Sequence, residues 1–192
     1  MTLLTDESGH LHRRSIRLKD YDYSQAGAYF VTLVVQNRDC ILGEIKNGNV
    51  ILSEAGRNAA QTWEWLASQY PYVELSEWIV MPNHLQGILV IHPCRGGSRS
   101  APTGTAPTQT NPTDTPVKIK PLGGLIGAFK TVSTEKWNEL NNMTGVILWQ
   151  RNYYEHIIRN GDEWERISRY IIANPIKWAE DENFPLGKNG QR

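Results

Sequence analysis

One stretch of this chain cannot contribute to a hydrophobic core, and it divides the residues that can into two blocks. Residues 95–116 read RGGSRSAPTGTAPTQTNPTDTP, with no aromatic side chain and no aliphatic one larger than alanine. Such a composition cannot offset the entropy lost on ordering, so the sequence predicts a flexible loop here. The loop is either a spacer without contacts or a mobile segment beside a binding groove. Any core must be built jointly by the residues before and after it.

The chain as a whole has the length and composition of one globular domain. It has 192 residues in all, of which 40% are hydrophobic, and this size fits one domain better than two. The 20 basic and 20 acidic residues cancel. This balance excludes a uniformly basic nucleic-acid coat and an acidic disordered tail, but it leaves room for a local basic face.

The sequence also indicates where the protein works. Cys40 and Cys94 are the two cysteines, too few for a disulfide framework, so a reducing compartment is expected. No apolar run approaches the roughly 18 residues that a membrane span needs. The N-terminus has no charged region followed by an apolar stretch, so no signal peptide is predicted. We therefore expect a cytoplasmic protein that does not enter a membrane.

Period-two and helical patterns predict an alternation of strands and helices before the loop. Asn47-Gly48 is a strong signal for a two-residue hairpin turn, and Ser53 is placed to cap a helix with apolar residues at helical spacing. The predicted elements are strands over 28–36, 72–81 and 84–92, a hairpin over 43–52 and a helix from 53 to 69.

After the loop, helical signals dominate. The capping-box pattern of Asn160 and Glu163 opens a helix that Asn174-Pro175 ends, since proline disfavours helical geometry in the residue before it. The predicted elements are helices over 122–140 and 161–173 and short strands over 146–149 and 153–158. The order predicts an α+β fold in which helices pack on one face of an antiparallel sheet.

Two polar side chains in the strand over 84–92 are candidate metal ligands. His84 and Gln86 are two apart, so they point to the same face of the strand, and Leu85 points to the other. An imidazole nitrogen with an amide oxygen makes half of a site that suits Mg²⁺ or Mn²⁺ better than thiol-binding metals. The alternative is a surface histidine on a strand with one polar face.

A second pair lies in the last predicted helix. Tyr170 and Asn174 are four residues apart and therefore lie on one helical face. A phenol with an amide one turn away can serve as a nucleophile and a third metal ligand, provided that a cation or a base activates it. The alternative is a tyrosine packed between sheet and helix, with Asn174 as the helix cap.

Basic residues near aromatic ones indicate contact with nucleic-acid phosphates and bases. Arg151 and Arg159 flank such a segment, although it also fits a half-buried edge strand with charged ends. Arg13, Arg14 and Arg17 form a short run that is either an ordering arm or a solvated terminus. The full predicted DNA-binding set is Arg13, Arg14, Arg17, Lys130, Arg151, Arg159, Arg166 and Arg169.

Four segments, in this order and spacing, resemble one family. They are RRSIRLKDYDYSQAGAYFVTL, WIVMPNHLQGILVI, WQRNYYEHIIRN and RYIIANPIKW. The sequence resembles the REP-associated tyrosine transposases, relatives of the single-tyrosine insertion-sequence transposases in the HUH nuclease group. The resemblance covers residues 14–178 as one domain, with 95–116 as a variable insert and with 1–13 and 179–192 as terminal extensions.

The resemblance implies a ferredoxin/RRM-like sheet and a specific chemistry. His84 takes the place of the first histidine of the HUH strand, and Tyr170, in a Tyr-Ile-x-x-Asn-Pro context, takes that of the catalytic tyrosine. A divalent Mg²⁺ or Mn²⁺ held by His84, Gln86 and Asn174 would polarise a phosphate of single-stranded or hairpin DNA. Tyr170 would attack it and form a 5′-phosphotyrosine, so that cutting and rejoining need no ATP.

Gln86 departs from the family pattern, which has a second histidine there. Replication initiators of some small circular DNA viruses also carry His-apolar-Gln and cleave DNA. The alternative is a protein derived from a transposase that binds hairpin DNA or RNA without cutting. A small-molecule hydrolase has little support, because no nucleophile elbow, P-loop or HExxH motif is present. The family includes dimers and monomers, so both states stay open.

Overall fold

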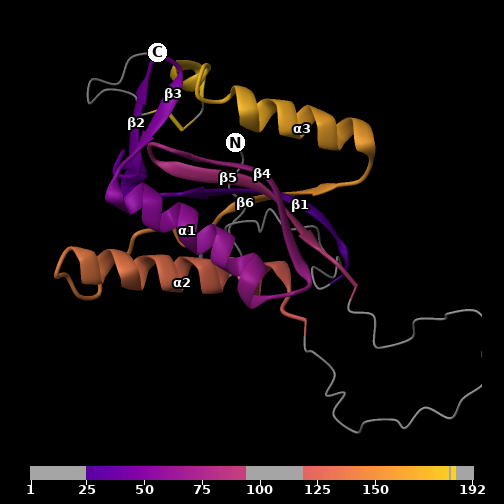
Figure 1. The fold of residues 1–192 in the computed structure, drawn as a ribbon, viewed down its shortest axis with the longest axis horizontal. Helices are drawn as coiled ribbons and strands as arrows, with labels where there is room; N and C mark the ends of the chain where they lie inside the picture. The colour runs from indigo at the N-terminus through magenta and orange to yellow at the C-terminus, as the bar shows by residue number, and fades with distance from the viewer. Residues whose placement is uncertain (1–24, 94–118, 182, 185–192) are drawn as a thin grey trace, which may run out of the picture.

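The computed structural model describes residues 25–93, 119–181 and 183–184 (Figure 1). A four-stranded antiparallel sheet has the order β4-β5-β1-β6, and a separate hairpin pairs β2 with β3. The strands are β1 (Gly27–Val34), β2 (Gly43–Lys46), β3 (Asn49–Leu52), β4 (Val73–Met81), β5 (His84–Ile91) and β6 (Tyr154–Ile158). The helices are α1 (Glu54–Gln69), α2 (Leu122–Leu140) and α3 (Gly161–Ala173), with short 3-10 turns η1 (Gln36–Arg38) and η2 (Trp178–Glu180). The predicted α+β class with an antiparallel sheet is confirmed.

The local signals in the sequence act as predicted. Asn47 and Gly48 have φ values of 52° and 73°, the left-handed geometry that a tight hairpin turn requires. The Ser53 hydroxyl accepts a hydrogen bond from Gly56 N at 3.1 Å and caps α1. The Asn160 side chain accepts one from Glu163 N at 2.9 Å and caps α3. These bonds satisfy amide groups that the first turn of a helix leaves open.

The prediction that all helices pack on one face of the sheet is wrong for α3. Helices α1 and α2 cover one face, and α3 lies across the other (Figure 1). Strands β1 and β5 are apolar almost without interruption, so both of their faces need cover. Tyr29, Val31 and Leu33 therefore face α1 and α2, whereas Phe30 packs against α3.

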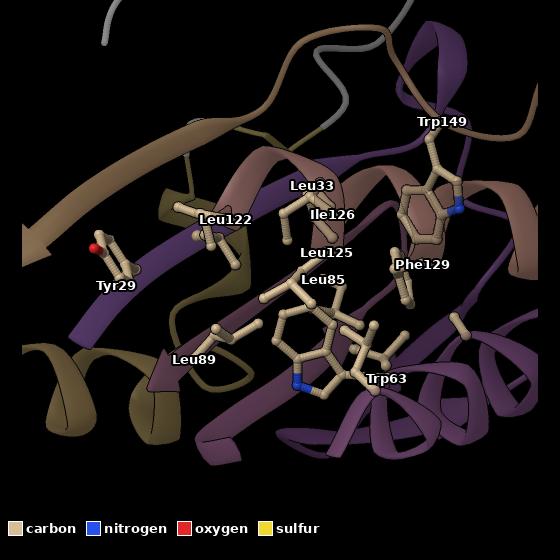
Figure 2. Packing of buried hydrophobic residues seen from close by; sticks show 14 of the residues in the cluster. Tyr29, Leu33, Trp63, Leu85, Leu89, Leu122, Leu125, Ile126, Phe129 and Trp149 are labelled. Atoms are coloured by element: carbon tan, nitrogen blue, oxygen red, sulfur yellow. The ribbon is translucent and has the colours of Figure 1, made fainter. Parts of the chain in front are cut away.

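The larger core lies between the sheet and α1 and α2 (Figure 2). The Trp63 and Phe129 rings meet edge to face with centroids 5.5 Å apart, and Phe129 also packs against Trp149 at 5.3 Å. The indole nitrogen of Trp149 donates to the Ser133 hydroxyl at 2.8 Å, so the one polar atom of this ring is satisfied. The smaller core under α3 comprises Phe30, Ile88, Ile158, Ile167 and Ile171.

Strand β4 has a bulge that shifts its pairing with β5. Leu75 pairs with Leu89 and Trp78 with Gly87, so β4 holds one extra residue between these pairs. A Cβ atom at Gly87 would lie 2.7 Å from the Trp78 Cβ, which explains the glycine. The Glu77 carboxylate at the bulge accepts hydrogen bonds from Ser76 and, at 3.0 Å, from Ser168 of α3. The Ser76 hydroxyl is the main cause of the lowered pKa of Glu77.

Two further predictions concern segments outside the main sheet and its three helices. The predicted strand over 146–149 is reduced to a single bridge between Val35 and Trp149, and Val146 and Ile147 before it are exposed. The predicted loop over 95–116 lies outside the described residues. None of the helices in the described ranges is both long and apolar enough to cross a bilayer.

Candidate active site

The α3 side of β5 carries two buried polar residues. His84 pairs with Met81 and Gln86 with Ile79, and both lie on the side of the strand that also bears Ile88 of the smaller core. His84 is 0% and Gln86 is 1% exposed. Leu85 belongs to the larger core on the opposite side. The predicted alternation along this strand is therefore confirmed, and the two candidate metal ligands share one face.

Helix α3 brings Tyr170 and Asn174 to the same place. Ile167 and Ile171 pack on the smaller core, and this orientation of the helix directs Tyr170 and Asn174 toward β5. Gln86 Nε2 donates to Tyr170 Oη at 3.2 Å, and Asn174 Nδ2 donates to Gln86 Oε1 at 2.7 Å. Two segments 84 residues apart thus form one hydrogen-bonded cluster. Asn174 is buried, whereas Tyr170 remains 44% exposed and accessible to a macromolecule.

Asn83 fixes the protonation pattern of the His84 ring. Asn83 Nδ2 donates to the carbonyl groups of Arg38 and Asn183, at 3.1 and 2.7 Å. The Asn83 Oδ1 atom is therefore left to accept from His84 Nδ1, 2.9 Å away. This bond places the ring proton on Nδ1 and leaves the Nε2 lone pair free. Nε2 is buried and has no hydrogen-bond partner among the residues that the structure describes.

The environment of His84 favours its neutral form. Burial lowers the pKa of His84 to about 4, with a further lowering by the Arg38 charge and an opposing effect of Asp181. The indole of Trp178 in η2 lies against the imidazole, with ring centroids 5.8 Å apart. A neutral imidazole with an open nitrogen is the form that binds a metal ion.

The donor atoms that His84, Gln86 and Asn174 offer suit a hard divalent cation better than zinc or copper. Gln86 and Asn174 supply amide oxygens and His84 supplies one nitrogen, a set without a thiolate. Over the described part of the chain, no three His, Cys, Asp or Glu side chains are grouped to hold a metal ion. The cluster therefore has one imidazole and two neutral amides. It carries no negative charge of its own that would offset a divalent cation.

A cavity of about 600 Å³ opens beside Tyr170. Arg166 and Arg169 of α3 and Lys177 after it line this cavity, together with the carboxylates of Glu180 and Asp181. Arg166 lies 3.6 Å from Glu163 and Arg169 lies 3.5 Å from Glu165, and the two arginine side chains are 70% and 75% exposed. Such pairs are weak, so both guanidinium groups remain available to a phosphate.

The other predicted DNA-binding residues are dispersed. Arg151 and Arg159 are exposed, and they precede and follow β6 in the sequence. Lys130 lies in α2, on the other face of the sheet, and donates to the carbonyl groups of Gln150, Arg151 and Asn152. Burial lowers the pKa of Lys130 to about 8. Arg13, Arg14 and Arg17 lie outside the described residues.

Four residues of this region were not identified from the sequence: Asn83, Lys177, Trp178 and Asp181. Lys177 had a usable signal, since it follows Tyr170 by seven residues and Asn174 by three. Asn83 stands next to His84, but its two carbonyl acceptors are far away in the chain. Trp178 and Asp181 reach His84 only through the fold, and no local pattern marks them.

Two comparisons place the chain among known proteins. No protein-family model matches the sequence. The fold is similar to that of a REP-associated tyrosine transposase solved in complex with a REP hairpin, with a TM-score of 0.54 at 16% identity over 88% of this chain and 77% of that one. An uncharacterized protein of Haemophilus influenzae is 38% identical over 177 residues, or 92% of this chain and 96% of the relative. By this identity and coverage, the chain belongs to the same protein family as the Haemophilus influenzae protein.

Proposed function

We propose that this protein is a metal-dependent transposase or endonuclease that cuts and rejoins single-stranded DNA near hairpins through Tyr170. The observation that carries the proposal is the contact of the Tyr170 hydroxyl with Gln86, two residues from the open nitrogen of His84. A half-exposed phenol beside two buried candidate ligands is an arrangement that covalent phosphoryl chemistry uses. The fold shared with a REP-associated tyrosine transposase supports the same reading.

The residues present suit a bound Mg²⁺ or Mn²⁺ ion. His84 through Nε2, and Gln86 and Asn174 through their amide oxygens, would hold it. When bound, the ion supplies Lewis-acid polarisation of the scissile phosphate. The three side chains carry no charge, so the substrate phosphate and the carboxylates at the nearby cavity, Glu180 and Asp181, balance the ion.

The chain's own residues would then carry out one transesterification. The Tyr170 oxygen forms a bond to phosphorus while the bond from phosphorus to the 3′ oxygen breaks. The phenol loses one proton and the departing 3′ oxygen gains one, so the step leaves the number of bonds and protons unchanged. The Gln86 amide, which donates to the phenol oxygen, orients Tyr170 toward the site. The phosphotyrosine keeps the energy of the broken bond for rejoining.

The cavity beside Tyr170 is suited to the flanking phosphates. Arg166, Arg169 and Lys177 line it together with Tyr170. Because the net charge of the chain is zero, DNA affinity has to come from such a local group of cations. Binding through phosphates releases counterions, so affinity should fall steeply between about 50 and 200 mM salt.

A second candidate function is hairpin DNA or RNA binding without cleavage. The specific observation in its favour is that the Gln86 amide already donates to Tyr170 and accepts from Asn174, so both of its polar atoms are engaged within the protein. A single imidazole with two amides also donates less to a metal ion than two imidazoles do. In this alternative the same cations hold the nucleic acid, and the phenol serves only as a hydrogen-bond partner.

One adduct assay separates the two candidates. The probe is an oligonucleotide with a hairpin and flanking single strands that traps the covalent product, incubated with Mn²⁺ and resolved under denaturing conditions. We expect a protein–DNA adduct that chelation prevents and that Tyr170→Phe abolishes. Tyr154→Phe is the matched control, because it removes another exposed phenol, and it should form the adduct normally. Gln86→His run alongside tests whether the amide limits the rate. Tight binding without an adduct at any Mn²⁺ concentration would support the second candidate.

A further inference from the structure

The aromatic side chains on the α3 face of the sheet form a continuous row that ends at Tyr170. The Phe30 ring meets the Tyr170 ring edge to face, with centroids 6.2 Å apart and an interplanar angle of 83°. On its other side Phe30 meets Tyr154 at 6.1 Å and 66°. We call Tyr154, Phe30 and Tyr170 the aromatic row. It connects the edge strand β6 to the candidate nucleophile.

Tyr154 is exposed at the β6 end of this row. Its ring is 50% exposed, whereas Phe30 is only 8% exposed. The pairing of Tyr154 with Thr32, and of His156 with Phe30, places Tyr154 on the α3 face of the sheet. Helix α3 packs mainly against β4 and β5, so it leaves the ring at β6 uncovered. Half of the Tyr154 ring is therefore open to a ligand, while its contact with Phe30 holds it against the sheet.

Exposed arginines flank Tyr154 in the sequence, a charge that suits an anionic polymer. Arg151 precedes it by three residues and Arg159 follows it by five, and both side chains are exposed. At the other end of the row, the cavity beside Tyr170 is lined by Arg166, Arg169 and Lys177. Exposed aromatic rings between cations are the arrangement by which proteins bind single strands, because rings stack on bases while cations hold phosphates.

We propose that Tyr154 is a stacking site for a nucleobase of the single-stranded substrate, close to the phosphate that Tyr170 attacks. The inference rests on the single-strand binding of the proposed function, but it does not require cleavage. Phe30 props the Tyr154 ring from the side, so the ring is held in place before the strand arrives. Because every base has an aromatic face, this site contributes affinity without selecting a sequence.

The adjacent tyrosine provides a contrast within the same segment. Tyr153 faces the opposite side of the sheet, where its ring packs against the larger core and lies 5.3 Å from the Lys130 ammonium. That ring is occupied in the folded protein. Of the two tyrosines, only Tyr154 is exposed on the face that carries the candidate active site.

The test compares two strands that differ only in their bases. The full chain is titrated with a fluorescent thymidine 12-mer and with a 12-mer of abasic sugar-phosphate, which carries the same number of phosphates. We expect the wild type to bind the thymidine strand about 10-fold or more tightly than the abasic one, since one stacked base is worth that much. Tyr154→Leu should remove most of this preference and leave the affinity for the abasic strand unchanged.

Three controls make the outcome decisive. Tyr154→Phe keeps the ring and should keep the preference for the thymidine strand. Ile172→Ala removes an exposed side chain of α3, away from β6, and should leave this preference unaltered. Thermal melts verify that each variant is folded. An unchanged preference in Tyr154→Leu, or no preference in the wild type, would overturn the stacking site even if Tyr170 forms an adduct. A preference that Tyr154→Leu abolishes supports the site even if no adduct forms.

Discussion

The two faces of the central sheet use the same strands in different ways. On the α1 and α2 face, large side chains such as Trp63, Phe129 and Trp149 fill the space, and the buried polar side chains of α1 and α2 are hydrogen-bonded within this core. On the α3 face, a smaller apolar core borders the buried polar residues His84, Gln86 and Asn174. Alternate residues of β5 thus contribute to stability on one side and to a candidate site on the other. The comparison teaches that the two properties should be separable by mutation.

The largest expected effect comes from a change on the densely packed face. Trp63→Ala removes a side chain that is 0% exposed and packs against Phe129. We expect it to lower the free energy of unfolding by about 3–5 kcal/mol, measured by chemical denaturation. Folded protein should still form the adduct, because Trp63 does not contact the site. Loss of the adduct at an equal folded fraction would contradict the division between the faces.

An intermediate effect is expected from pH on the other face. Burial holds the pKa of His84 near 4, below the value of 6.5 for an exposed histidine, so the unfolded chain takes up this proton first as the pH falls. The free energy of unfolding of metal-free protein should therefore decrease between pH 6.5 and 4 by roughly 3 kcal/mol. His84→Asn should remove this part of the pH dependence. An identical pH profile in that variant would show that other groups cause it.

The smallest effect on stability is expected at Tyr170, the candidate nucleophile. Tyr170→Phe removes one hydroxyl from a ring that is 44% exposed, and its contact with Gln86 is long, at 3.2 Å. The free energy of unfolding should change by less than about 1 kcal/mol, although the same change should abolish the adduct. A large loss of stability would instead mean that Tyr170 is a structural residue of the α3 face.

Local patterns predicted most of the elements, because their causes are local. The bounds of α2, the Asn160 cap of α3 and the Asn47-Gly48 turn depend on neighbours in sequence. The position of α3 was predicted wrongly because the period of an apolar helix stripe does not tell which sheet face it covers. Nothing in the pattern of Lys130 indicated that three backbone carbonyls would surround its ammonium.

The pairings within the candidate site followed from the sequence only in part. Spacing put His84 beside Gln86 and Tyr170 beside Asn174, but their meeting across 84 residues depends on packing. Only the family resemblance predicted that the two pairs lie in one site. The role of Asn83 was beyond both approaches, because its partners come from η1 and from residue 183, which local spacing does not connect.

The rotation and translation of α3 relative to the sheet decide which of its side chains reach β5, and the bulge in β4 affects both. A displacement of α3 by one residue would move it about 1.5 Å along its axis and turn its side chains by about 100°, carrying the phenol away from Gln86. The bulge aims Glu77 at Ser168, which lies two positions before Tyr170. One additional residue in an edge strand thereby helps to set the position of the helix that bears Tyr170.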